Sequence, residues 1–325
     1  RFLVGVRPTR RLGAGNFGEV WLGEWRDGEK VALKKLKNAD GLAEFLQEAA
    51  FSDVLHHAAV VRTLGVWVGE DAAGGAEAHI VLEYMAGGSL LDYLRSRDEL
   101  ALDDVVRMLV QAAAGLAHLH SHRLVHRDVA ARNYLLDARA RAVKLSDFGL
   151  ARATDDSYYY AQHTADQPIP LRWTAPEVAQ RRRWTPRSDV YAFGVTMWEV
   201  VSLGAMPFGE LTNEQLVAAL GKMGGGGHGD GGDALLALTV PDGAGDRCPA
   251  WLGTLIERCT ARDPTQRPVM REVLETLQAH CAEQLYIVTD VAGVDNGYEV
   301  APARDTDAPG KTIVLARDTT ETELD

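Results

Sequence analysis

The chain has 325 residues, 46% of them hydrophobic and 25% charged, which is enough for one large core or for two lobes. Its formal net charge of −12 argues against sequence-independent binding to nucleic acid, which needs basic patches. No run of about 18 apolar residues predicts a membrane span, and three cysteines without metal-ligand spacing favour a reducing compartment.

Residues 1–36 predict strands around a glycine-rich loop. The motif G-x-G-x-x-G-x-V places Gly13, Gly15 and Gly18 between Leu12 and Val20. Glycines allow the backbone to approach a phosphate closely, because no Cβ atom intervenes. A dinucleotide-binding fold would place a helix directly after the glycines, whereas a strand-like run follows here. The motif therefore favours a phosphate-covering hairpin, although taken alone it would indicate no more than a flexible turn.

Residues 31–34 form the next predicted strand, Val-Ala-Leu-Lys. Alternation places Ala32 and Lys34 on one face of this strand and Val31 and Leu33 on the other. Ala32 would leave room for a flat base and Lys34 would reach its phosphates. The alternative is that Lys34 is a solvated surface lysine, as lysines usually are.

Residues 41–57 predict a helix, because Leu42, Phe45, Leu46 and Ala49 recur at helical spacing. Glu48 lies beside this stripe and could point toward Lys34. Glu44, one turn earlier, is the competing acid.

Strands are predicted at 60–68 and 79–85, and the break Ala86-Gly87-Gly88 predicts a hinge between two lobes. Ser89 is expected to cap a helix, and residues 103–120 to form a longer scaffold helix. The predicted organisation is a small lobe over 1–85 and a large lobe over 86–283. A mobile Gly-rich insertion is expected at 221–233, and an acidic, flexible tail at 284–325.

Two short segments contain the polar residues expected to perform chemistry. The first is His126-Arg127-Asp128-Val129-Ala130-Ala131-Arg132-Asn133, and the second is Lys144-Leu145-Ser146-Asp147-Phe148-Gly149. Asp128, Asn133 and Asp147 could place one base and two hard-oxygen metal ligands around a phosphate. Mg²⁺ is usually bound in this way, by one or two carboxylates together with phosphate oxygens.

A long polar stretch follows Gly149 and ends at Pro170–Glu177. Loops of this length inside a domain are usually functional, and this one contains Tyr158, Tyr159 and Tyr160. Residues 189–199 predict a buried helix that includes Asp189, a carboxylate which must find partners. The last packed helices are expected over about 249–283.

In this order and spacing, the motifs resemble those of the protein kinase family from about residue 8 to about 282. The resemblance implies an α+β fold with a β-rich small lobe and a mostly helical large lobe. It implies ATP and Mg²⁺ as cofactors, with Asn133 and Asp147 as metal ligands. It also implies that Glu177 pairs with Arg267 and that Asp189 holds the backbone of the 126–133 loop.

The same resemblance assigns roles to single residues. The catalytic set is Asp128 as the acceptor of the hydroxyl proton, Arg132 beside it, and the ion pair of Lys34 with Glu48. Leu82 occupies the gatekeeper position and Glu83–Met85 the hinge that would bond the base. The implied ATP-binding residues are Leu12, Gly13, Gly15, Gly18, Val20, Ala32, Lys34, Leu82, Glu83, Met85, Leu135 and Asp147. The regulatory candidates are Tyr158, Tyr159, Tyr160, Tyr286 and Tyr298.

Within the family the chain is most similar to tyrosine kinases, because Ala130-Ala131-Arg132 follows Asp128 and Pro170–Glu177 resembles their peptide platform. The expected partners are tyrosine-containing proteins, with SH2-type adaptors on the tail and no nucleic acid. A receptor parent at the inner face of the plasma membrane is favoured over a cytosolic kinase. The alternatives are a serine/threonine or dual-specificity kinase and a kinase-fold scaffold without catalysis. Ser52 and Thr63, polar at usually apolar spine positions, leave basal activity open.

Overall fold

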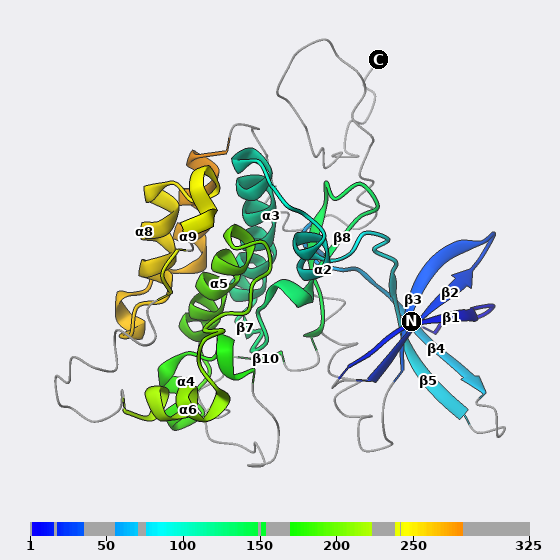
Figure 1. The fold of residues 1–325 in the computed structure, drawn as a ribbon. Helices are drawn as coiled ribbons and strands as arrows, with labels where there is room; N and C mark the ends of the chain where they lie inside the picture. Colours follow the sequence, from blue (N-terminus) through cyan, green and yellow to red (C-terminus); the bar gives the residue numbers. More distant parts are fainter. Residues whose placement is uncertain are drawn as a thin grey trace, which may run out of the picture.

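The computed structural model describes residues 2–15, 18–35, 56–70, 76–148, 151–153, 170–222, 238–240 and 242–281. Figure 1 shows a β-sheet on one side of the molecule and a group of helices on the other, which confirms the predicted two-lobed α+β architecture. None of the helices in these ranges combines the length and apolar character that crossing a membrane would require.

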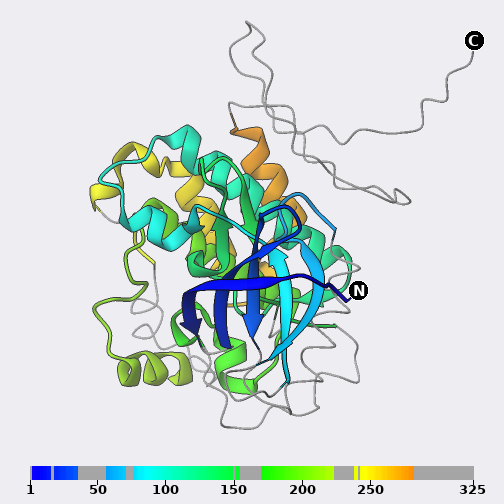
Figure 2. The ribbon, with the colours of Figure 1, turned by 90° about the vertical axis from the view of Figure 1, so that its right-hand side faces the viewer.

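The small lobe is built on a five-stranded antiparallel sheet in the order β1-β2-β3-β5-β4. Its face in Figure 2 lies in front of the helices. Val31 and Leu33, which the alternation placed on the same face of the third strand, are completely buried. They pack with Leu3, Trp25 and Val81 in the small lobe's own apolar cluster. The five strands are β1 Arg7–Gly15, β2 Gly18–Trp25, β3 Glu29–Lys35, β4 Thr63–Glu70 and β5 Ala76–Glu83.

Several element boundaries differ from the sequence prediction, and the strand expected at 79–85 is found at Ala76–Glu83. The strand expected at 60–68 begins only at Thr63, because Val60 instead forms a bridge with Leu145 of the large lobe. The helix expected over 41–57 does not include His56 and His57, which are not helical. The Nδ1 atom of His57 accepts the backbone N–H of Ala59 at 3.1 Å, a local bond that competes with helix continuation. Residues 36–55, including Glu48 and Ser52, lie outside the described part of the chain.

Two glycines allow close backbone approaches, Gly87 within the large lobe and Gly115 between the lobes. At Gly87, in the predicted hinge, a Cβ atom would lie 2.2 Å from the carbonyl oxygen of Asp137. At Gly115, on the longest helix, a Cβ atom would lie 2.4 Å from the carbonyl oxygen of Ala59. Neither position can accommodate a side chain unless the backbone moves.

The large lobe is a group of helices with short strands and 3₁₀ turns along one side. Its helices are α2 Leu90–Arg95, α3 Leu102–Ser121, α4 Pro176–Arg181, α5 Pro186–Val201, α6 Asn213–Lys222, α8 Ala250–Cys259 and α9 Met270–Ala279. Its short strands are β6 Gly88–Ser89, β7 Leu124–Val125, β8 Tyr134–Leu136, β9 Val143–Leu145 and β10 Arg152–Ala153. The 3₁₀ turns are η2 Ala131–Asn133, η5 Leu171–Trp173, η7 Asp242–Arg247 and η8 Pro264–Gln266.

Helix α5 lies in the middle of this lobe, with α3 and α8 packed against it. Its start is well defined, because the Thr185 hydroxyl accepts the Ser188 N–H and Pro186 takes the first helical turn. Almost every residue from Ser188 onward is buried, which is the pattern of a helix surrounded by protein on all sides. Polar side chains on α5 therefore face other parts of the protein and must find partners there.

The predicted insertion at 221–233 begins later than expected. Gly221 and Lys222 are still part of α6, because glycine and lysine are both tolerated in the last turn of a helix. Residues 223–233 lie outside the described ranges.

Histidines stack where the small lobe meets the end of α3. The rings of His57 and His118 are stacked with their centroids 4.6 Å apart, and His122 lies 4.4 Å from His118. The Nε2 atoms of His57 and His118 are buried and have no hydrogen-bond partner among the described residues. Burial therefore lowers the pKa of His57 from 6.5 to about 4 and that of His118 to about 3, and neighbouring cationic groups add to both effects.

We expect the free energy of unfolding to be lower at pH 5 than at pH 7.5. Both folded-state pKa values lie below the unfolded value of 6.5, so the unfolded chain binds more protons once the pH falls below 6.5. The stability that this pair contributes is complete above pH 6.5 and is lost as the pH falls toward 4. Each histidine alone would account for about 2 kcal/mol at pH 5, and because both side chains are partly exposed we expect a combined loss of about 2–4 kcal/mol.

Urea unfolding at the two pH values measures this loss, and a His57→Gln, His118→Gln double variant is the control. The difference between the two proteins isolates the histidines from other titrating groups. An equal pH dependence in both proteins would contradict the prediction.

Candidate active site

Asp189 of α5 holds the backbone of the loop that contains Asp128. The Asp189 carboxylate accepts the backbone N–H groups of His126 at 2.7 Å and Arg127 at 2.9 Å. The ring of His120 contacts the same carboxylate at 3.0 Å. Asp189 is 1% exposed, and these bonds offset the desolvation of its charge. The implied role of Asp189 is therefore present in the structure, and His120 helps to hold its carboxylate in place.

His126 joins the loop to the segment that contains Asp147. Its Nε2 atom lies 3.0 Å from the carbonyl oxygen of Ser146, and its ring meets Phe148 edge to face. Arg127 and Asp147 both have positive φ angles, 71° and 62°. Non-glycine residues in this conformation cost about 1–3 kcal/mol each and cluster at functional sites. The backbone turns at Arg127 and Asp147 are therefore held in this conformation by the residues packed around them.

The Asp128 carboxylate has a donor on each oxygen. Arg132 donates to Oδ1, and the Asn133 amide nitrogen donates to Oδ2 at 2.8 Å and to the Asp128 carbonyl at 2.6 Å. Asp128 is 6% exposed, so these donors supply the hydrogen bonds that a largely buried carboxylate needs. Because the amide nitrogen of Asn133 is directed at Asp128, its carbonyl oxygen is the atom left to act as a metal ligand.

Lys34 of the small lobe reaches the large-lobe carboxylate across the site. Its Nζ atom lies 2.8 Å from Oδ1 of Asp147, and Lys34 is 7% exposed. A buried, paired ammonium excludes the alternative of a solvated surface lysine. The ion pair of Lys34 with Asp147 thus joins the two lobes, and the hydroxyl of Ser146, next to Asp147 in the chain, donates to the Asn133 backbone carbonyl at 2.7 Å.

The structure describes several side chains that are implied for ATP binding. Val20, Ala32, Leu82 and Leu135 are all partly exposed. Ala32 and Leu82 face each other on β3 and β5, which fits a flat ligand between small and branched side chains.

One backbone group of the predicted hinge is already bonded within the protein. The backbone N–H of Glu83 donates to the Arg62 carbonyl at 2.9 Å, so that N–H is not available to a base. The Glu83 carboxylate bonds Lys144 at 2.8 and 2.9 Å and stiffens the connection between the lobes. Met85 remains a candidate hinge contact, and it is 8% exposed.

The glycine-rich loop is described only in part. Gly15 pairs with Gly18 at the tip of the β1–β2 hairpin, and a Cβ atom at Gly13 would meet nothing within 4 Å. Leu12 is exposed at 37%. The remaining candidate residues, Glu48, Tyr158, Tyr159, Tyr160, Tyr286 and Tyr298, lie outside the described ranges.

Sequence reasoning missed one buried acid at the site, Glu199 of α5. Its Oε2 atom accepts the backbone N–H of Ala131 at 2.9 Å and the indole N–H of Trp173 at 2.8 Å. Burial raises the pKa of this carboxyl from 4.5 to about 7, against the opposing effect of those two bonds and of Arg132 and Arg95. An acid inside an apolar helix was the available signal, the same one that identified Asp189.

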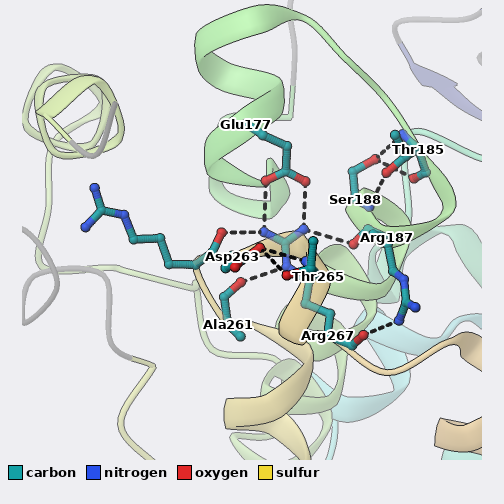
Figure 3. A network of polar contacts seen from close by, with 9 residues as sticks. Glu177, Thr185, Arg187, Ser188, Ala261, Asp263, Thr265 and Arg267 are labelled. Atoms are coloured by element: carbon teal, nitrogen blue, oxygen red, sulfur yellow. Dashed lines mark hydrogen bonds and ion pairs between the residues drawn. The ribbon is translucent and has the colours of Figure 1, made fainter. Parts of the chain in front are cut away.

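The closing segment Pro170–Glu177 is anchored to the rest of the large lobe. Arg172 donates to the backbone carbonyls of Pro207 at 2.8 Å and Leu211 at 2.8 Å. Its guanidinium is thus occupied by the protein itself. Figure 3 shows the second anchor, in which the Glu177 carboxylate meets the Arg267 guanidinium with two parallel bonds of 2.7 and 2.8 Å. This ion pair is the one that the resemblance implied.

A family model described as protein tyrosine and serine/threonine kinase matches residues 6–228. The chain belongs to the protein kinase family. It is 35% identical over 274 residues to the tyrosine-protein kinase transforming protein Fps of avian sarcoma virus (strain PRCII), covering 83% of the chain and 47% of that protein. It is 34% identical over 287 residues to the tyrosine-protein kinase SRK3 of Spongilla lacustris, covering 86% of the chain and 79% of that protein.

These relatives place the kinase domain in the tyrosine kinase group. A second viral Fps, from Fujinami sarcoma virus, is 35% identical over 83% of the chain but only 29% of its own length is covered. The kinase domain therefore spans about half or less of the two viral relatives and most of SRK3.

Replacing Lys34 by Met should lower kcat of this kinase on the order of a hundredfold and leave the domain folded. The charge that would meet the phosphates is lost, whereas the aliphatic part of the side chain is kept. Turnover of a tyrosine peptide with Mg²⁺-ATP measures the effect. Lys30→Met, an exposed position on the same strand, is the control, and equal activity in both variants would contradict the role of Lys34.

Proposed function

We propose that this kinase transfers the γ-phosphoryl group of ATP to tyrosine hydroxyls in proteins. The observation that supports the proposal most directly is the pairing of four residues, Asp128 with Asn133 and, across the lobes, Lys34 with Asp147. Each has the chemistry that phosphoryl transfer needs, a proton acceptor, two oxygen ligands and a cation.

In the proposed reaction the tyrosine oxygen bonds to the γ-phosphorus, the bond to ADP breaks, and the phenolic proton passes to the Asp128 carboxylate. Arg132 and Asn133, both bonded to that carboxylate, hold it in place. Asn133 and Asp147 would hold Mg²⁺, which when bound neutralises phosphate charge. Lys34 would position the phosphates of ATP.

The test is a phosphotransfer assay with the purified chain, Mg²⁺-ATP and two peptides that differ only in tyrosine or serine at the acceptor position. Phosphate on the tyrosine peptide alone supports the proposal. Phosphate on serine would favour the serine/threonine alternative, and no phosphate on either peptide would favour a scaffold.

Three finer parts of the proposal rest on the sequence. We infer that Tyr158, Tyr159 and Tyr160 are autophosphorylated, and that Tyr286 and Tyr298 of the acidic tail follow and recruit SH2-type adaptors. We also infer a receptor parent whose kinase domain lies at the inner face of the plasma membrane, with a cytosolic tyrosine kinase as the alternative. Mass spectrometry after incubation with Mg²⁺-ATP locates the phosphates, and the sequence of the parent transcript decides between a receptor and a cytosolic kinase.

A further inference from the structure

One carboxylate oxygen joins two separate segments of the active site. Oε2 of Glu199 accepts the N–H of Ala131, three residues after Asp128, and the indole N–H of Trp173, at the end of η5. The acceptor side chain comes from α5 and is 1% exposed. Glu199 therefore links the loop that contains the proton acceptor to the segment on which a peptide is expected to lie.

A second contact closes this link into a ring. The Arg132 guanidinium lies over the Trp173 ring, 4.5 Å from its centroid, and donates to the Asp128 carboxylate. The orientation of the indole fixes the plane on which Arg132 rests. Because Glu199 holds the indole at its N–H edge, it determines indirectly where Arg132 meets Asp128.

A glutamate at position 199 is destabilising, because its carboxyl group is removed from water. Burial disfavours its charge, and a leucine would fill the interior of α5 without that desolvation. The two donors that face Oε2 and the guanidinium groups of Arg132 and Arg95 oppose the cost only in part. The acid is therefore better explained by what it positions than by stability.

We propose that Glu199 is a positioning residue that holds the peptide platform Leu171–Trp173 against the catalytic loop and so determines how tightly the tyrosine-containing peptide binds. This inference rests on the proposed function. The groups assigned to ATP, which include Ala32, Lys34 and Leu135, make no hydrogen bond to Glu199 in the described part of the chain. Binding of the peptide should therefore depend on this link and binding of ATP should not.

The central experiment compares Trp173→Phe with Trp198→Phe. Trp173→Phe keeps an aromatic ring under Arg132 and removes the N–H donated to Glu199. Trp198, the neighbour of Glu199 on α5, donates its indole N–H to the Thr239 carbonyl at 2.8 Å, away from the site. Both variants thus lose one indole hydrogen bond, but only one of them loses the link.

For Trp173→Phe we expect the KM for the peptide to rise about 5- to 10-fold, which corresponds to the loss of one hydrogen bond of ordinary strength. The KM for ATP should stay within about twofold of the wild-type value. Trp198→Phe should change neither constant by more than about twofold.

Variants of Glu199 test the same link from its other end. The amide oxygen of Glu199→Gln can still accept both N–H groups, so we expect the KM for the peptide to stay within about threefold of wild type. Glu199→Leu accepts neither, and we expect a rise of about tenfold or more. Adding Trp173→Phe to Glu199→Leu should change little, because the bond is already absent. If Glu199→Leu does not fold, the Trp173→Phe and Glu199→Gln pair still tests the link.

An unchanged peptide KM in Trp173→Phe would overturn the inference, as would equal changes in the KM for peptide and for ATP. An equal effect of Trp198→Phe would also overturn it, because the loss would then be one of general stability. Failure of the wild-type protein to phosphorylate tyrosine would contradict the proposed function instead, so the two outcomes are distinguishable.

Discussion

Asp128→Asn is expected to lower kcat by two to four orders of magnitude, the range typical for removal of a positioned general base. Asparagine keeps the size and shape of the side chain but cannot accept the phenolic proton. Arg132 and Asn133 would also meet a neutral amide in place of the carboxylate to which both now donate. The KM for ATP should change little, since the loss occurs in the transition state.

The matched control is Asp104→Asn, in which the same atoms change at a surface carboxylate that pairs with Arg107. Steady-state kinetics with a tyrosine peptide gives kcat, and thermal unfolding verifies that both variants are folded. Wild-type turnover by Asp128→Asn would remove Asp128 from its assigned role and with it the proposed function.

Arg267→Met is expected to lower the free energy of unfolding by about 3–5 kcal/mol. Arg267 is 1% exposed, and all five of its N–H donors are used (Figure 3). Two meet the Glu177 carboxylate, and three meet backbone carbonyls, those of Ala261 at 2.7 Å, Arg187 at 3.0 Å and Arg262 at 3.1 Å. Methionine would leave a partly buried carboxylate and these carbonyls without their donor.

The control is Arg271→Met, four residues further along, where an exposed Arg271–Glu275 pair has an N–O distance of 3.6 Å. Exposed pairs of this kind contribute less than about 1 kcal/mol. Urea unfolding at pH 7.5 measures both variants. Arg267→Lys should be intermediate, because an ammonium keeps the charge but has three donors and no planar fork. Similar losses at positions 267 and 271 would contradict the argument from burial.

The sequence was most informative where local pattern decides the structure. Alternation placed Val31 and Leu33 on the same face of β3, and the structure shows that both are buried. The sequence was less reliable at element ends, as with Val60, whose partner Leu145 belongs to the other lobe. Strand ends depend on which backbone lies alongside, and a local pattern contains no information about that neighbour.

The candidate site divides in the same way. Asp128, Asn133 and Asp147 could be selected from the order and spacing of short motifs, because family resemblance preserves spacing. Glu199 escaped selection, since nothing near it in the sequence indicates that its partners are Ala131 and Trp173. The lowered pKa values of His57 and His118 also depend on burial at a stack that forms between distant segments.

By itself the sequence determined the fold class, the order of the elements and the identity of the polar residues in the two motifs. Periodicity and spacing are properties of the amino-acid sequence, so they can be identified before the structure is known. Only the tertiary structure decided which donor meets which acceptor, as for Asp189 with His126 or Arg267 with Glu177. The reason is that a buried charge must be satisfied by whatever group packing brings within about 3 Å of it, and packing joins residues that lie far apart in the chain.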